Sequence, residues 1–156
     1  MTLKAGDKAP DFTLTDDSGI TRTLSGLLAD GPVVLFFYPA ANTSGCTAEA
    51  CHFRDLAAEF EAVGAQRVGI SVDDVEAQRA FAAKNGFDYP LLADVGGTVA
   101  ASYGVKRGSL MGRLAPVKRA TFVIGTDGTI KQVVTSETKM DVHADEALKA
   151  LRPSGG

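Results

Sequence analysis

The sequence lacks the features of a nucleic-acid-binding, membrane-spanning or secreted protein. Its formal net charge is -3 and its pI is near 5.3, whereas a protein that binds nucleic acid or a membrane surface has a basic face. The longest apolar stretch, 32–41, is about half of the ~20 residues that a membrane helix needs. The N-terminal stretch MTLKAGDKAP has no apolar segment of a secretory signal. We therefore expect a soluble, cytoplasmic protein with no nucleic-acid or membrane partner.

Internal repeats, low-complexity segments and linkers are also missing. The chain of 156 residues, 45% of them hydrophobic, is long enough for one domain with a full core. We expect this domain to span 1–152 and the tail 153–156 to be flexible.

Hydrophobic spacing along the chain predicts an α/β fold. The run VVLFFY, ended by Pro39, is typical of a strand buried on both faces. A turn at 16–19 predicts an N-terminal β-hairpin, and a second hairpin is expected around the turn 126–128. Further strands are expected at 67–72 and 91–93, and helices at 46–63, 73–85, 98–103 and near 144–151. This order predicts a single-domain, thioredoxin-like fold with a mixed central sheet flanked by helices.

The two cysteines, Cys46 and Cys51, lie five positions apart where the apolar run gives way to a helix. Three interpretations are open: small buried hydrophobes, metal ligands, or a redox couple. A metal site would need partners such as His52 and the distant His143, and the pattern lacks the tight ligand pairs of structural zinc. The start of a helix is a place where a thiolate is stabilised and cysteine pKa values fall well below ~8.5.

A redox couple makes a strong geometric demand. Residues i and i+5 of an intact helix lie ~8.7 Å apart between Cα atoms, whereas a disulfide needs them within about 7 Å. The two cysteines therefore cannot bond to each other unless the first turns of the helix unwind.

The stretch 39–46, PAANTSGC, resembles the P-x-x-x-T-x-x-C signature of peroxiredoxins, and FYPAANTSGCTAEACHFRD is similar to their Q-type subfamily, the bacterioferritin comigratory proteins. In that subfamily a second cysteine follows at the same spacing. The resemblance also covers GDKAPDFTL (6–14), YGV (103–105) and RATFVI (119–124). It departs at Ser44, where the subfamily usually has proline. The resemblance implies a peroxiredoxin fold and a thiol-dependent peroxidase that reduces hydrogen peroxide and organic hydroperoxides.

The resemblance also implies a role for each matching residue. Cys46 would be the peroxidatic cysteine, which peroxide oxidises to a sulfenic acid. Thr43 would place its hydroxyl between sulfur and substrate, and Arg119 would stabilise the thiolate and the leaving oxygen. Pro39 would cover the site. Cys51 would be the resolving cysteine, forming an intramolecular disulfide that a thioredoxin-type dithiol reductant later opens.

Other interpretations of the same residues remain open at this point. Cys51 could be a packed helix residue in an enzyme that is resolved by an external thiol. The chain could instead be a redox sensor or holdase whose disulfide switches partner binding, whereas a disulfide reductase is disfavoured because C-x-x-C is missing. Glu49 is expected to hold the first helical turn or to pair with a cation. The cation-rich segment 105–119 is a candidate for reductant docking. The sequence shows no metal, flavin or haem motif, and an intramolecular couple favours a monomer.

Overall fold

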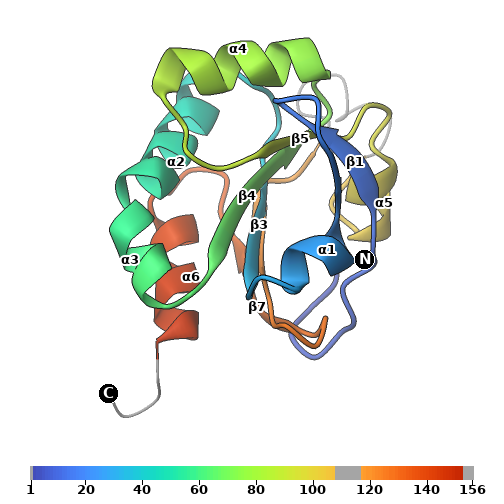
Figure 1. Cartoon of the computed structure of the whole chain (residues 1–156), viewed down its shortest axis with the longest axis vertical. Coiled ribbons are helices and arrows are strands. Elements are labelled where there is room, and N and C mark those ends of the chain that lie inside the picture. Colours follow the sequence, from blue (N-terminus) through green and yellow to red (C-terminus); the bar gives the residue numbers. More distant parts are fainter. Residues whose placement is uncertain (1, 108–116, 153–156) are drawn as a thin grey trace.

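The apolar run after Pro32 forms strand β3 (Val33–Phe37), which lies inside a mixed sheet in the computed structural model (Figure 1). The structure describes residues 2–107 and 117–152. Within these residues the sheet has seven strands, in the order β2-β1-β5-β4-β3-β6-β7. The other strands are β1 (Thr13–Asp16), β2 (Thr21–Thr23), β4 (Gln66–Ser71), β5 (Leu91–Ala93), β6 (Ala120–Ile124) and β7 (Ile130–Thr135).

Strand directions in the sheet follow from the connections. Strands β3, β4 and β5 are mutually parallel, as expected where helical crossovers join them. The two hairpins, β1–β2 and β6–β7, add antiparallel strands at the two edges, and β6 pairs antiparallel with β3. Both predicted hairpins and the mixed sheet of the α/β prediction are confirmed.

Helices cover both faces of the sheet. On one face lie α2 (Ser44–Asp55), α3 (Ala57–Ala62) and α6 (Val142–Leu151), and on the other lie α1 (Leu24–Leu28) and α5 (Thr98–Ser102) (Figure 1). Helix α4 (Val75–Asn85) runs across the top of this view and packs on the same apolar cluster as α2, α3 and α6.

Strand β3 contributes to both halves of the core, because successive side chains of a strand point to opposite faces. Leu35 and Phe37 join the cluster with α1 and α5, whereas Phe36 and Tyr38 join the cluster with α2, α3, α4 and α6. Full burial of such side chains contributes about 1.5–3 kcal/mol each. The strand is therefore fixed from both sides, and the residues that follow it start from a rigid position.

The expected single helix over 46–63 is wrong in two details. The helix starts at Ser44, and the chain leaves helical geometry at Leu56, so that α2 and α3 are separate. Phe53 and Phe60, on either side of the break, are both fully buried, with ring centroids 5.8 Å apart. The apolar positions in the sequence therefore keep the spacing of one continuous helix.

Helix α1 was not predicted from the sequence, and helix α4 was. The single turn of α1, which Thr23 caps by accepting from Gly26 N, is too short to show a helical period. The sequence offers Asp73 or Asp74 as the N-cap of α4 and Gly86 beyond its end. In the structure the side chain of Asp74 accepts from Ala77 N, and Gly86 ends the helix in the left-handed conformation.

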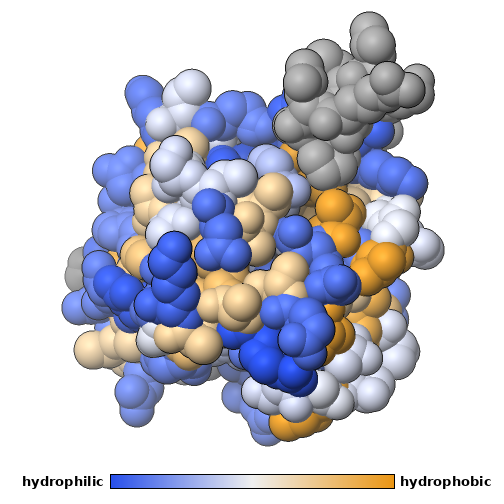
Figure 2. Space-filling model, turned by 90° about the horizontal axis from the view of Figure 1, so that it is seen from above, coloured by the Kyte–Doolittle hydropathy of each residue, from blue (hydrophilic) through white to orange (hydrophobic). Residues whose placement is uncertain are grey.

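Hydrophilic residues cover much of the face seen in Figure 2, and hydrophobic residues gather toward one side of it. Ile20 and Val95 are the large hydrophobic side chains that the described residues leave exposed. None of the helices described is both long and apolar enough to cross a bilayer. The predicted tail 153–156 and most of the cation-rich segment 105–119 lie outside the described residues.

Candidate active site

The carboxyl end of β3 delivers the chain to the loop before α2. Tyr38 N donates to Ile70 O at 3.1 Å, so the pairing with β4 continues one residue past the strand. Pro39, which is half-buried, then interrupts the pairing because proline has no N–H. Asn42 adopts a φ of 64°, which asparagine tolerates better than most residues, and this turns the chain into the helix.

Cys46 is the third residue of α2, and its side chain is buried with 1% exposure. The first turn of a helix has backbone N–H groups without intrahelical partners and a partial positive charge. Arg119 approaches the sulfur from the other side, with Nη2 donating to Cys46 Sγ at 3.3 Å. The sulfur therefore lies between a helix N-terminus and a guanidinium, and both stabilise negative charge on it.

Arg119 is buried, with 6% exposure, immediately before β6. Its backbone N–H donates to both carboxylate oxygens of Glu137 at 3.1 and 3.2 Å, and its Nη1 donates to Glu49 Oε1 at 2.7 Å. Burial lowers the pKa of the guanidinium, but its electrostatic interactions and hydrogen bonds with Glu49 and Cys46 outweigh this and raise it overall. Arg119 is therefore a fixed cation aimed at the sulfur.

Glu49 lies one turn after Cys46 on α2 and is fully buried. Burial raises the pKa of its carboxyl to about 8, although the charge and hydrogen bond of Arg119 pull it down. Its second oxygen, Oε2, lies 3.5 Å from Nδ1 of the buried His143. The expectation that Glu49 pairs with a cation is confirmed.

Thr43 occupies the backbone position of the α2 N-cap, but its side chain makes no capping hydrogen bond. The hydroxyl instead donates to Ala40 O at 2.9 Å, and Thr43 O accepts from Thr47 Oγ1 at 2.7 Å. Because the hydroxyl proton is used within the loop, the oxygen lone pairs remain free to accept a hydrogen bond from an incoming O–H group.

Cys51 is half-buried, further along the unbroken helix α2, and both cysteines are free thiols. Its Sγ lies 3.8 Å from Oδ1 of Asn85, at the end of α4. The backbone carbonyl of Asn85 in turn accepts from Arg54 Nη1 at 2.7 Å. The structure thus places both cysteines on one helix, five positions apart, as the sequence predicts.

A buried polar network under the loop was not predicted from the sequence. Asp73 Oδ2 accepts from Ala41 N at 2.8 Å and from Ser71 Oγ at 2.6 Å. Gln78 Nε2 donates to Ser71 Oγ at 3.0 Å, and Gln78 Oε1 accepts from the Tyr38 hydroxyl. The network connects the end of β3, the end of β4 and α4, and it fixes the loop from below.

Two further residues at the site were not singled out from the sequence. A Cβ atom added to Gly45 would lie 3.3 Å from Arg119 Nη2 and 3.3 Å from Met140 Cε. Gly45 therefore allows the guanidinium and the thioether of Met140 to approach the first turn of α2.

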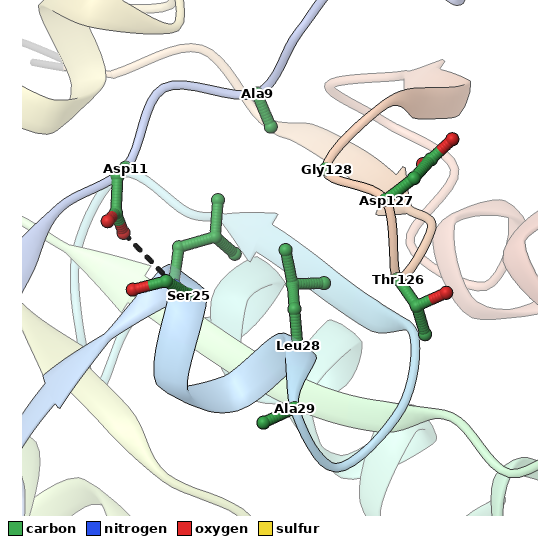
Figure 3. Close-up of a pocket in the computed structure, with 9 residues that line it drawn as sticks. Ala9, Asp11, Ser25, Leu28, Ala29, Thr126, Asp127 and Gly128 are labelled. Carbon is green, nitrogen blue, oxygen red and sulfur yellow. Dashed lines mark hydrogen bonds between the residues drawn. The ribbon is translucent and has the colours of Figure 1, made fainter.

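Other parts of the described structure offer no comparable chemistry. No group of three or more His, Cys, Asp or Glu side chains within 2–107 and 117–152 could hold a metal ion. A cavity of about 400 Å³ lies between the N-terminal segment, α1 and the β6–β7 turn (Figure 3). Both lining carboxylates are already engaged, since Asp11 Oδ1 accepts from Phe12 N and Ser25 N, and Asp127 Oδ1 accepts from Thr129 N. None of its lining residues is one of those around Cys46.

Comparisons with known proteins show the family of the chain. The AhpC/TSA family model matches residues 5–133. The chain is similar to peroxidoxin BcpB from Mycobacterium tuberculosis, whose crystal structure matches with 63% identity and a TM-score of 0.91, covering 96% of this chain and 97% of that one. It is also 42% identical to the chloroplastic peroxiredoxin Q of Arabidopsis thaliana, over 96% of this chain and 68% of the relative.

A third similar protein, peroxiredoxin Q of Xanthomonas campestris, matches with 32% identity and a TM-score of 0.81, over 90% of this chain and 89% of that one. Structures of that bacterioferritin comigratory protein concern its alkyl peroxide reduction activity. Two of its solved variants replace two different cysteines that lie 36 positions apart in that protein, whereas the cysteines here lie five apart.

Proposed function

The chain belongs to the AhpC/TSA family and is a peroxiredoxin, a thiol peroxidase, and we propose that Cys46 is the cysteine that reacts with peroxide. The observation that supports this most strongly is the 3.3 Å hydrogen bond from Arg119 Nη2 to the buried Cys46 Sγ at the start of α2. A cation held at this distance stabilises the thiolate, which is the nucleophilic form of cysteine.

In the proposed first step the Cys46 thiolate attacks one oxygen of the peroxide. A sulfur–oxygen bond forms and the oxygen–oxygen bond breaks, so that sulfur is oxidised by two electrons to a sulfenic acid. The leaving oxygen departs as hydroxide or alkoxide and takes up a proton. Negative charge moves from sulfur to this oxygen, and the fixed donors of Arg119 stabilise it there.

Thr43 and Pro39 are proposed to shape the space in front of the sulfur. The Thr43 hydroxyl donates its hydrogen bond to Ala40 O, so its oxygen can accept a hydrogen bond from the O–H of the peroxide and orient it. Pro39, half-buried before the loop, presents an apolar ring without an N–H, which limits access of water to the sulfenic acid.

Cys51 is proposed to resolve the sulfenic acid. Its thiol would attack the sulfur of Cys46, forming a disulfide and releasing one water. Both residues lie on the continuous helix α2, where Cα atoms five apart are too distant to be bridged. The first turn of α2, which the bond from Thr47 N to Thr43 O helps to close, must therefore open before the disulfide forms.

Peroxide substrates follow from the family, and the remaining partners belong to the proposal. A disulfide formed within one chain is reduced by a small dithiol protein, so a thioredoxin-type reductant fits the chemistry. Because the couple needs no second chain, a monomer suffices. Reduced thiols, which the cycle requires, are maintained in the cytoplasm, and we place the protein there.

The test is the second-order rate constant of the reduced protein with hydrogen peroxide. The sequence has no tryptophan to report the reaction, so competition against a haem peroxidase for limiting peroxide is the suitable assay. A fast reaction that Cys46→Ser abolishes and Cys51→Ser preserves supports the proposal. A rate no faster than that of a small-molecule thiolate would overturn it and favour the redox sensor.

A further inference from the structure

His143 is fully buried and held by two hydrogen bonds that define its protonation. Its Nε2 lies 2.9 Å from Ser136 O, and because a backbone carbonyl only accepts, Nε2 must carry a hydrogen. Nδ1 lies 2.8 Å from Thr121 Oγ1. In a neutral ring Nδ1 is then the acceptor, and the Thr121 hydroxyl donates to it.

The lone-pair side of His143 faces the carboxyl group of Glu49. Glu49 Oε2 lies 3.5 Å from Nδ1 and has no hydrogen-bond partner among the described residues, although it is buried. An ionised Oε2 would have no hydrogen-bond donor among the described residues, and it would face a second acceptor. A proton on Oε2 removes the repulsion, because the O–H then faces the lone pair of Nδ1, which it shares with the Thr121 hydroxyl.

The charged groups around the pair lead to the same protonation state. Arg119 contacts Glu49 from the start of β6, and Glu137 adds a negative charge from the loop before α6. Burial raises the pKa of Glu49 to about 8 against the pull of Arg119. Burial also lowers the pKa of His143, and Arg119 lowers it further, although the bond to Ser136 and the charge of Glu137 oppose this. Both members of the pair are therefore neutral at pH 7.

We propose that His143 is a positioning residue that holds Glu49 in its protonated form, so that the positive charge of Arg119 acts on the Cys46 sulfur without a competing carboxylate. Neutral Glu49 still accepts from Arg119 Nη1 through Oε1 and keeps the guanidinium in place. This inference rests on the proposed peroxidase function. It assigns Glu49 and His143 the role of keeping the charge of Arg119 available to Cys46.

The consequence is a loss of peroxide reactivity when Glu49 ionises. A carboxylate 2.7 Å from Arg119 Nη1 would partly neutralise the positive charge that stabilises the Cys46 thiolate and the leaving oxygen. A change of about 1 kcal/mol in the stabilisation of the transition state corresponds to roughly fivefold in rate. We expect the rate constant of the wild type with hydrogen peroxide to fall by about fivefold to tenfold above a midpoint near pH 8.

The experiment measures this rate constant by competition kinetics from pH 6 to 9.5 in full-length variants. Glu49→Gln keeps the acceptor for Arg119 and cannot ionise, so the alkaline fall should disappear. His143→Gln retains a donor toward Ser136 but has no acceptor at the Nδ1 position, and its midpoint should shift down by about one pH unit or more. His143→Asn, which puts an amide oxygen near that position, should restore most of the shift.

The control is His52, the other histidine of the chain, which is paired with Asp145 on the surface of α2. His52→Gln should leave the midpoint in place. An unchanged midpoint in His143→Gln, with only the overall rate reduced, would mean that His143 is merely structural and would overturn the proposal.

A spectroscopic readout keeps the inference separate from the peroxidase assignment and from folding of the His143 variants. The infrared difference spectrum between wild type and Glu49→Gln should show the carbonyl band of a protonated carboxyl group at pH 7 and lose it at pH 9. Fast, Cys46-dependent peroxide reduction without this band would overturn the role of His143 and leave the proposed function intact. A band with slow peroxide reduction would support the protonation state and overturn the function.

Discussion

Arg119 Nη2 lies 3.3 Å from Cys46 Sγ, although 73 positions of sequence separate the two residues. The sheet register accounts for this contact. Strands β3 and β6 are antiparallel neighbours in which Phe37 lies opposite Ala120. The residue before β6 and the loop after β3 therefore meet where the carboxyl end of β3 lies beside the amino end of β6. The guanidinium therefore takes its position from the backbone register.

Replacing Arg119 with alanine should slow the reaction with hydrogen peroxide by about 100-fold or more, since the loss of one donor to a developing oxyanion typically costs 10²–10³. Arg119→Lys should recover only part of the rate, because an ammonium cannot contact Cys46 and Glu49 through two fixed nitrogens. The measurement is the second-order rate constant at pH 7.

The matched control is Arg79→Ala, which removes an exposed arginine paired with Glu76 on α4. It should react like the wild type. Equal rates for the Arg79 and Arg119 variants would contradict a role of Arg119 in the first step.

Adding one methyl group at Gly45 should separate activity from stability. In a helix alanine is more stable than glycine by roughly 0.5–1 kcal/mol, so Gly45→Ala should not lower the urea midpoint. Its Cβ would lie 3.3 Å from Arg119 Nη2 and from Met140 Cε, and these atoms must move. Because a misplacement of about 1 Å can cost 100-fold, we expect a decrease of about tenfold in the peroxide rate constant.

The double variant Gly45→Ala, Met140→Ala tests the cause of that decrease. With the thioether removed, the guanidinium has room to return toward Cys46, and part of the rate should recover. A wild-type rate in Gly45→Ala would show that the first turn tolerates the methyl group, and a reduced rate that Met140→Ala does not recover would show that the thioether is not the cause.

The sequence predicted those parts of the fold that local patterns determine. The run at 33–38 predicted the buried strand, and the turns at 16–19 and 126–128 predicted both hairpins. The ends of α4 were predicted at Asp73 or Asp74 and at Gly86, and the structure has Asp74 as the cap. The separation of α2 from α3 at Leu56 was beyond such patterns, since Phe53 and Phe60 keep a helical spacing through it.

The site divides in the same way. Cys46 was singled out from its place at the start of a predicted helix and from the family resemblance, and Arg119 from the resemblance alone. The residues that contact them are brought there by tertiary packing. Asp73 Oδ2 accepts from Ala41 N because the carboxyl ends of the parallel strands β3 and β4 lie side by side. His143 reaches Glu49 because α6 packs against α2. Neither contact has a local signature in the sequence.

Removing the carboxylate of Asp73 should loosen the loop before Cys46. Asp73 Oδ2 accepts from Ala41 N and Ser71 Oγ, and losing such an acceptor leaves partly buried donors unsatisfied at a cost of about 1–3 kcal/mol. Asp73→Ala should therefore lower both the free energy of unfolding and the peroxide rate constant.

The neighbouring residue provides the control for this variant. Asp74→Ala removes the cap of α4, whose side chain accepts from Ala77 N, and should cost about 1 kcal/mol without slowing the reaction. If Asp73→Ala loses stability but reacts as fast as Asp74→Ala, the network does not position the loop.

Stability should depend on pH through Glu49. Its carboxyl pKa is raised from 4.5 to about 8 in the folded protein, chiefly by burial, so the folded state holds a proton that the unfolded state has released. The contribution is fully present below pH 4.5 and is lost as pH rises toward 8, by at most about 1.4 kcal/mol per pH unit. Urea unfolding of wild type and Glu49→Gln between pH 5 and 9 should show this decline in the wild type alone.

Two further comparisons isolate that effect. The exposed Glu61 on α3 serves as control, and Glu61→Gln should keep the wild-type profile. The pKa of His143 is lowered by burial, so its contribution is present above pH 6.5 and is lost as pH falls, which gives an opposite slope on the acid side. Parallel profiles for wild type and Glu49→Gln from pH 5 to 9 would contradict a raised pKa at Glu49.

Cys51→Ser should separate the two halves of the catalytic cycle. The first step uses Cys46 and Arg119, so its rate constant should stay within about twofold of the wild type, because the serine hydroxyl is nearly isosteric with the half-buried thiol. Thioredoxin-coupled turnover should be lost, since no second thiol of the chain remains to form the disulfide. Mass spectrometry after one equivalent of peroxide should find a Cys46–Cys51 disulfide in the wild type and a sulfenic acid in Cys51→Ser. If the variant kept full turnover, an external thiol would be resolving Cys46 directly, and α2 would not need to unwind during the cycle.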